Sequence, residues 1–184
     1  MTQDDLSLEA RGGLPETLRV LLADYPREGW PSDPGFGGLV AFWLDRHLMF
    51  RNLTSGLQQA AESEMDGAMA RDALALRIGR LGSALVQGLH GHHQIEDQHY
   101  FPRLAVMDRR LLRGFEILDK DHHAMDGLLD RFARSANAVI RGEAETGTFR
   151  EELLSFSAML ERHLWDEEDL VVPVILRHGA AGLE

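Results

Sequence analysis

The sequence contains no cysteine in its 184 residues, which excludes disulfides, thiolate zinc sites and iron–sulfur clusters. It also lacks an excess of positive charge: its formal net charge is −11, whereas nucleic-acid binding needs clustered Lys and Arg. No apolar run approaches the ~20 residues of a membrane-spanning helix, and the acidic start of the chain does not resemble a signal peptide. These absences predict a cytoplasmic protein with neither a nucleic-acid nor a membrane partner.

The sequence has little of the alternating apolar pattern that is typical of β-strands. Its apolar residues instead recur every three or four positions, as on one face of an α-helix. Four such stretches follow one another, at about residues 37–64, 66–102, 108–142 and 148–174. Short connections between them favour an up-down-up-down order. We therefore predict an all-α fold, a four-helix bundle.

The first part of the chain has a different composition, because residues 1–34 contain four of the six prolines. We interpret this part as an N-terminal extension that lies over a core, with a short helix at residues 15–24. The bundle itself is predicted at residues 35–184.

Each predicted helix places one histidine on its apolar face. On the second and fourth helices a glutamate follows the histidine by four residues, so that each pair shares one helical face. The candidate metal ligands are His47, His92, Glu96, His122, His163 and Glu167. Six ligands are too many for one tetrahedral zinc and suit two octahedral ions about 3.5–4 Å apart. Without metal, such an interior would be costly, because a buried unpaired carboxylate costs several kcal/mol.

The second helix leaves an alternative open, because His93 and Asp97 are also four residues apart. We prefer His92 with Glu96, since His92 continues the apolar face that contains Leu89. The remaining histidines, His93 among them, have no comparable support and are interpreted as ordinary core or surface residues. The acids expected to be solvated helix-face charges are Asp97, Asp166, Glu168 and Asp169.

The second and fourth helices contain the same phrase: a histidine, three residues, two acids, and a proline ten positions after the histidine. This phrase resembles that of the hemerythrin-like (HHE cation-binding) family, which runs His, three residues, Glu, a second acid, and then Phe-Pro. Residues 92–102 match it, and residues 163–173 match it with Val in place of Phe. Asp121-His122 resembles the pair at the family's third ligand position, and His47 resembles the first-helix histidine.

The resemblance covers about residues 36–178 and implies a hemerythrin-like bundle with a non-heme di-iron centre. It implies two iron ions with an oxo or hydroxo bridge, and manganese or zinc as substitutes. The implied function is to bind or react with dioxygen or a related small ligand such as nitric oxide. Oxygen or iron sensing, iron handling and the response to redox stress are the roles that follow.

One position departs from the oxygen-carrying members, which have a second histidine one turn after the third-helix histidine. Here that position is Asp126. We expect Asp126 to be a further ligand or a residue beside the ligands. An oxygen-rich, nitrogen-poor site disfavours reversible oxygen transport, so we rank the carrier third.

The second-ranked reading is a sensory or docking module, metal-dependent or metal-free, without redox chemistry. A ferritin-like bundle needs two Glu-x-x-His motifs; Glu96 to His99 supplies one, but Leu170 stands where the motif beginning at Glu167 needs a histidine, so we disfavour this class. No nucleophile–base arrangement, phosphate loop or dinucleotide fingerprint indicates an enzyme. The oligomeric state stays open.

Overall fold

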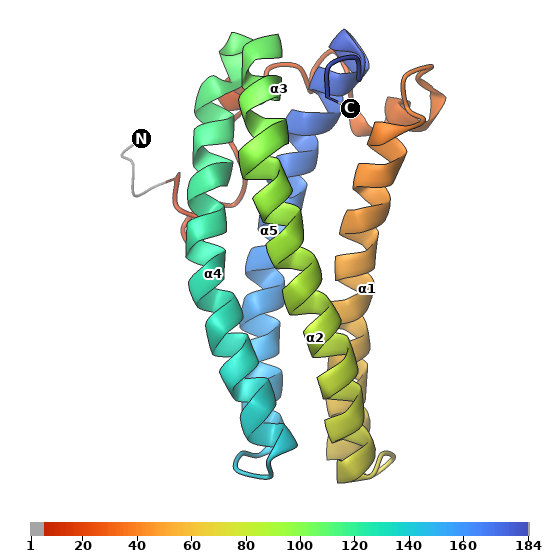
Figure 1. The fold of residues 1–184 in the computed structure, drawn as a ribbon, viewed down its shortest axis with the longest axis vertical. Coiled ribbons are helices and arrows are strands. Elements are labelled where there is room, and N and C mark those ends of the chain that lie inside the picture. The colour runs from red at the N-terminus through yellow and green to blue at the C-terminus, as the bar shows by residue number, and fades with distance from the viewer. Residues whose placement is uncertain (1–5, 184) are drawn as a thin grey trace. The chain divides into compact units, whose positions relative to one another are not determined.

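The structure is a computed structural model that describes residues 6–183, and the regular elements in this range are all helical (Figure 1). The α-helices are α1 (Leu39–Met65), α2 (Arg71–Ile95), α3 (Phe101–Met107), α4 (Leu112–Ile140) and α5 (Thr146–His178). The shorter elements are the 3₁₀-helices η2 (Glu16–Leu18), η3 (Arg27–Ser32) and η5 (Arg109–Leu111) and the π-helix η4 (Glu96–Tyr100). The prediction of an all-α protein is confirmed.

The chain divides into two compact units. Within the described residues, the first unit contains residues 6–47, 93–123 and 162–183. The second unit contains residues 48–92 and 124–161. Helices α1, α2, α4 and α5 contribute segments to both units.

The second unit consists of four helical segments around an apolar core. Phe132 is fully buried in this core, and its ring centroid lies 5.9 Å from that of Phe149 and 5.4 Å from that of Phe156. The connections from α1 to α2 and from α4 to α5 lie at the same end of this unit (Figure 1). Gly142, with a φ of +71°, follows the end of α4 in the left-handed conformation that glycine adopts most readily.

The first unit has a core that includes the N-terminal segment, which we define as residues 6–34. Leu14, Leu21 and Trp30 of this segment are buried in one apolar cluster with Val40 and Phe115. The prediction of a helix at residues 15–24 is wrong, because only the three residues of η2 are helical there and turns follow them. Burial of apolar side chains against the core holds this segment, so it does not need a regular helix.

The second predicted helix is interrupted where the sequence suggested continuity. Helix α2 ends at Ile95, the π-helix η4 follows, and Pro102 lies in the first turn of α3. A proline is tolerated there because an N–H in the first turn has no partner within the helix. The wider π turn shifts the buried face, so that buried Glu96 is followed by buried Phe101, five residues later.

The fourth predicted helix also continues beyond its proline, since Pro173 lies inside α5. None of the helices in residues 6–183 has a stretch long and apolar enough for a membrane span.

Candidate metal centre

Three buried histidines of the first unit, each from a different α-helix, form one group. One ring nitrogen each of His93 in α2, His122 in α4 and His163 in α5 lies within 4.8 Å of the other two. The Nε2 atoms of His122 and His163 are 3.1 Å apart, and the His93 ring stacks on His122 with centroids separated by 3.9 Å. Nitrogen atoms that converge in this way are suited to hold one transition-metal ion.

Two buried glutamates and a fourth histidine of the same unit form a second group. Ligand atoms of His47, Glu96 and Glu167 also lie within 4.8 Å of one another. One oxygen of Glu167 is 3.3 Å from His47 Nε2, and the other is 3.5 Å from His163 Nε2. Glu96 Oε2 lies 3.6 Å from His122 Nε2. Both carboxylates therefore face both groups, which is the placement that bridging carboxylates need.

The charges of this centre favour a bound cation. Burial raises the pKa of Glu96 well above its usual value, and the negative charge of Glu167 raises it further. Burial lowers the pKa of His47, but Glu167 and Glu168 outweigh this and raise it to about 9. Burial lowers the pKa of His163, which favours the neutral imidazole that a metal needs. Two carboxylates at full burial are stabilised by positive charge, so the donor set fits metal cations.

The outer nitrogen of three of these histidines faces a carboxylate. The Nδ1–oxygen distances are 2.9 Å for His47 and Glu168, 2.6 Å for His122 and Asp97, and 3.5 Å for His163 and Asp121. A carboxylate at Nδ1 holds the proton there and leaves Nε2 free to bind a metal. Histidines oriented in this way are typical of metal centres.

Five of the predicted ligands are brought together in the first unit: His47, Glu96, His122, His163 and Glu167. The sixth, His92, is the last residue of a second-unit segment, where its ring lies 5.3 Å from that of Phe50. Asp126 is exposed on α4 and belongs to neither group described above. The assignment of all these residues as ligands stays a prediction.

Sequence reasoning set His93 aside, yet the structure places it among the three histidines. The available signal was the doublet His92-His93, because neighbouring residues on a helix point about 100° apart and can face different ions. With His93 present, the expectation of a nitrogen-poor site loses its support.

The expectation of solvated charges is wrong for three of the four acids. Asp166, Glu168 and Asp169 are at most 5% exposed, because arginines of the N-terminal segment cover them. Asp97 is partly exposed, with 30% of its side chain accessible, and its carboxylate faces His122. Four consecutive acids at residues 166–169 span the circumference of a helix, so they could not all lie on one solvated face.

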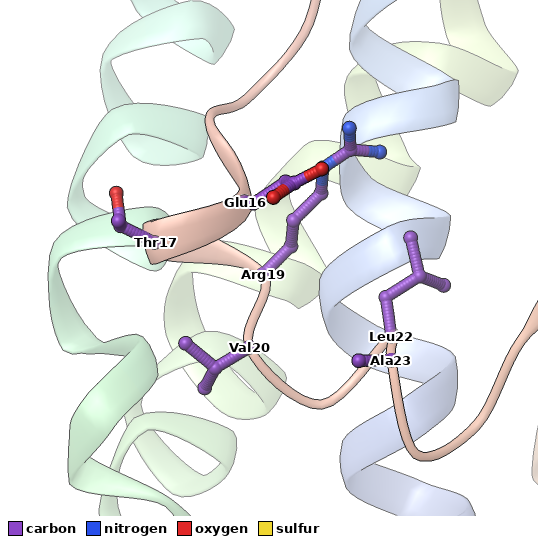
Figure 2. A pocket seen from close by; sticks show the side chains of 6 residues that line it. All are labelled: Glu16, Thr17, Arg19, Val20, Leu22 and Ala23. Atoms are coloured by element: carbon purple, nitrogen blue, oxygen red, sulfur yellow. The ribbon is translucent and has the colours of Figure 1, made fainter.

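A separate surface cavity of about 580 Å³ lies in the first unit, along η2 and the turn that follows it (Figure 2). None of the candidate ligands lines it; its lining residues are Glu16, Thr17, Arg19, Val20, Leu22 and Ala23. The candidate metal centre is therefore distinct from this cavity.

Comparison with protein families gives one assignment. The model of the hemerythrin HHE cation binding domain matches residues 38–179, so the chain belongs to this family. The prediction of a hemerythrin-like helical bundle that binds cations is thereby confirmed. Neither the curated proteins nor the solved structures gave a match. The N-terminal segment lies outside the matched residues.

Proposed function

We propose that the centre holds two iron ions, one at each group, and that it reacts with dioxygen or a related small ligand. The observation that carries this is the position of Glu167, which directs one oxygen toward His47 and the other toward His163. A carboxylate between two sets of nitrogen donors suits a pair of ions better than a single one. Manganese and zinc are the substitutes that the donors allow.

The proposed ligands are the six predicted from the sequence together with His93. His92 is included because it lies one turn before Glu96 on the same helical face, next to His93 in α2. Asp126 is left out because it is exposed.

Bound iron would supply one-electron chemistry toward dioxygen or nitric oxide, and the protein's own groups prepare the site for it. The Trp43 indole donates a hydrogen bond to Glu167, and this holds the carboxylate between the histidines. The Phe101 ring stacks on His122 with centroids 5.3 Å apart and keeps water from that side of the group. These features suit oxygen or iron sensing, iron handling or a response to redox stress.

Metal analysis of protein purified from iron-replete cells tests the proposal. We expect close to two iron ions per chain in the wild type and a large loss of iron in Glu167→Gln, which keeps the side-chain shape but removes the bridging charge. Glu161→Gln is the matched control, since Glu161 lies on the same helix, is 45% exposed and pairs with Arg51. A ratio near one ion, or equal iron in both variants, would contradict a two-ion centre.

The reaction with dioxygen separates the candidate roles. A di-iron centre with a bridging oxygen gives near-ultraviolet absorption bands, whereas a zinc centre gives none. Stopped-flow mixing of the reduced protein with dioxygen makes the distinction: oxidation that does not reverse under vacuum would support sensing, iron handling or a redox-stress role. Recovery of the reduced spectrum under vacuum would instead indicate a reversible carrier.

A further inference from the structure

We propose that the N-terminal segment orients ligand histidines of the metal centre, with Arg11 and Arg27 as positioning residues. Each arginine binds a carboxylate, and that carboxylate binds a ligand histidine. The inference rests on the proposed two-iron function, but it concerns residues outside the part of the chain that matches the family.

Arg11 reaches the three-histidine group through Asp121. Its side chain is 2% exposed, its Nη1 lies 2.9 Å from Asp121 Oδ1, and its Nη2 donates to Oδ2 of the same carboxylate. This two-point contact fixes the plane of the carboxylate, whose Oδ2 also faces His163 Nδ1 at 3.5 Å. The Nε of Arg11 binds Asp166 at 2.8 Å, which fixes the guanidinium in turn.

Arg27 reaches the second group through Glu168. Its Nη1 lies 2.7 Å from Glu168 Oε2, while the other oxygen of Glu168 lies 2.9 Å from His47 Nδ1. The Arg27 Nε also binds Asp169 at 2.7 Å. The N-terminal segment thus supports one histidine in each group by the same relay of arginine, carboxylate and imidazole.

The relay has a definite electronic consequence. A guanidinium draws electron density from its carboxylate, which then accepts less strongly from the imidazole N–H, so the imidazole donates less charge to the metal. Loss of the arginine leaves a more basic carboxylate beside the histidine, and this stabilises the ferric state. It also frees the carboxylate to move, which loosens the histidine it holds.

Arg19 provides a matched control. It belongs to the same segment, and Figure 2 shows its side chain extending toward α5, where Nη1 binds Asp169 at 2.7 Å. Arg19 and Arg27 are similarly exposed, at 31% and 22%, and both bind Asp169. They differ in that Arg27 also binds Glu168, the acid beside His47.

The test compares Arg11→Gln, Arg27→Gln and Arg19→Gln in the iron-loaded full-length chain. The readouts are the midpoint potential, from a spectroscopic redox titration, and the rate of iron release to a chelator. We expect Arg11→Gln and Arg27→Gln to lower the potential and to speed release by about tenfold or more, the scale of lost support to a ligand histidine. Arg19→Gln should match the wild type, and Arg27→Lys should restore much of the potential because it keeps the charge.

The outcomes are separable. If the wild type holds two irons and Arg27→Gln behaves like Arg19→Gln in both readouts, the inference is overturned while the proposed function stands. If the wild type does not hold two irons, both are overturned. If buried Arg11→Gln fails to fold by circular dichroism, the partly exposed Arg27 decides the question with its lysine variant.

Discussion

The two units bury very different side chains. Among the described residues, the polar side chains buried in the second unit are Thr54 and Thr146, and the rest of its interior is apolar. The first unit buries every charged or histidine side chain that is buried in residues 6–183, including Arg11, Asp121 and Glu167. The second unit can be stable through apolar burial, whereas the first depends on matched charge.

This difference shows how one bundle can combine a stable scaffold with a reactive site. The helices of the first unit bring carboxylates and imidazoles together at a desolvation cost, which the N-terminal arginines and, in the proposed function, two cations offset. The second unit carries no comparable cost. Changes to charge should therefore affect the first unit, and changes to apolar volume should affect the second.

Metal removal should have the largest effect on stability, and it should destabilise the first unit more than the second. Without cations the buried carboxylates of Glu96 and Glu167 lose the positive charge proposed to stabilise them, and metal binding contributes to folding free energy. We expect chelation to lower the melting temperature clearly and to increase amide hydrogen exchange in residues 93–123 and 162–183. Residues 48–92 and 124–161 should keep most of their protection. Equal loss in both sets would mean that the units do not differ as proposed.

A core truncation in the second unit should have the next largest effect. Phe132→Ala removes a fully buried ring that contacts Phe149 and Phe156, and such changes cost about 3–5 kcal/mol. Denaturant unfolding should show this loss while iron content per folded chain stays unchanged. Phe42→Ala, at a position 54% exposed, is the control and should change stability little. A parallel loss of iron in Phe132→Ala would contradict the proposal that changes to apolar volume affect the second unit and not the metal centre.

The sequence predicted the helices and five of the clustered residues because both depend on a period of 3.6 residues. Helical periodicity places His47, His122 and His163 on the buried faces, and the spacing of four adds Glu96 and Glu167. The π-helix after Ile95 could not be foreseen, since it adds a residue without changing the sequence pattern nearby.

The supports supplied by the N-terminal segment could not be predicted either. Arg11 meets Asp121 across 110 positions of sequence, and nothing local to an irregular segment encodes such a contact. Contacts of the same long-range kind, from Arg11 to Asp166 and from Arg27 to Glu168 and Asp169, explain why acids of α5 that were expected to be solvated are buried. Long-range charge pairing therefore overrode the local pattern.

His93 provides the third test, in which one histidine of the first unit is removed. If His93 completes the three-histidine group, His93→Ala should weaken one of the two ions by about 10–100-fold and leave about one iron per chain after dialysis. His90→Ala, at an exposed position of the same helix, should leave the iron content unchanged. Iron content is measured together with the melting temperature, so that unfolding is separated from ligand loss. Full iron in His93→Ala would return the second helix to His92 as its sole histidine ligand.

The smallest effect is expected at Asp108, a charge of the first unit that is matched without any metal. Its carboxylate accepts from the Arg110 backbone N–H and caps η5, and the Arg110 guanidinium lowers its pKa from 3.8 to about 2. Because the pKa in the folded state is below the ordinary value, the carboxylate stabilises the fold above about pH 4, and this contribution is lost as pH falls toward 2.

Asp108→Ala should cost about 1 kcal/mol at neutral pH, the usual value of a helix cap, since the Arg110 side chain is 53% exposed and its ion pair is screened. Denaturant unfolding, with iron content matched between wild type and variant, should show the gap in unfolding free energy narrowing from about pH 5 to about pH 3. Asp108→Asn should keep most of the cap and lose the pH dependence. A gap that widens on acidification would show instead that Asp108 is a buried charge whose desolvation cost its partners do not offset.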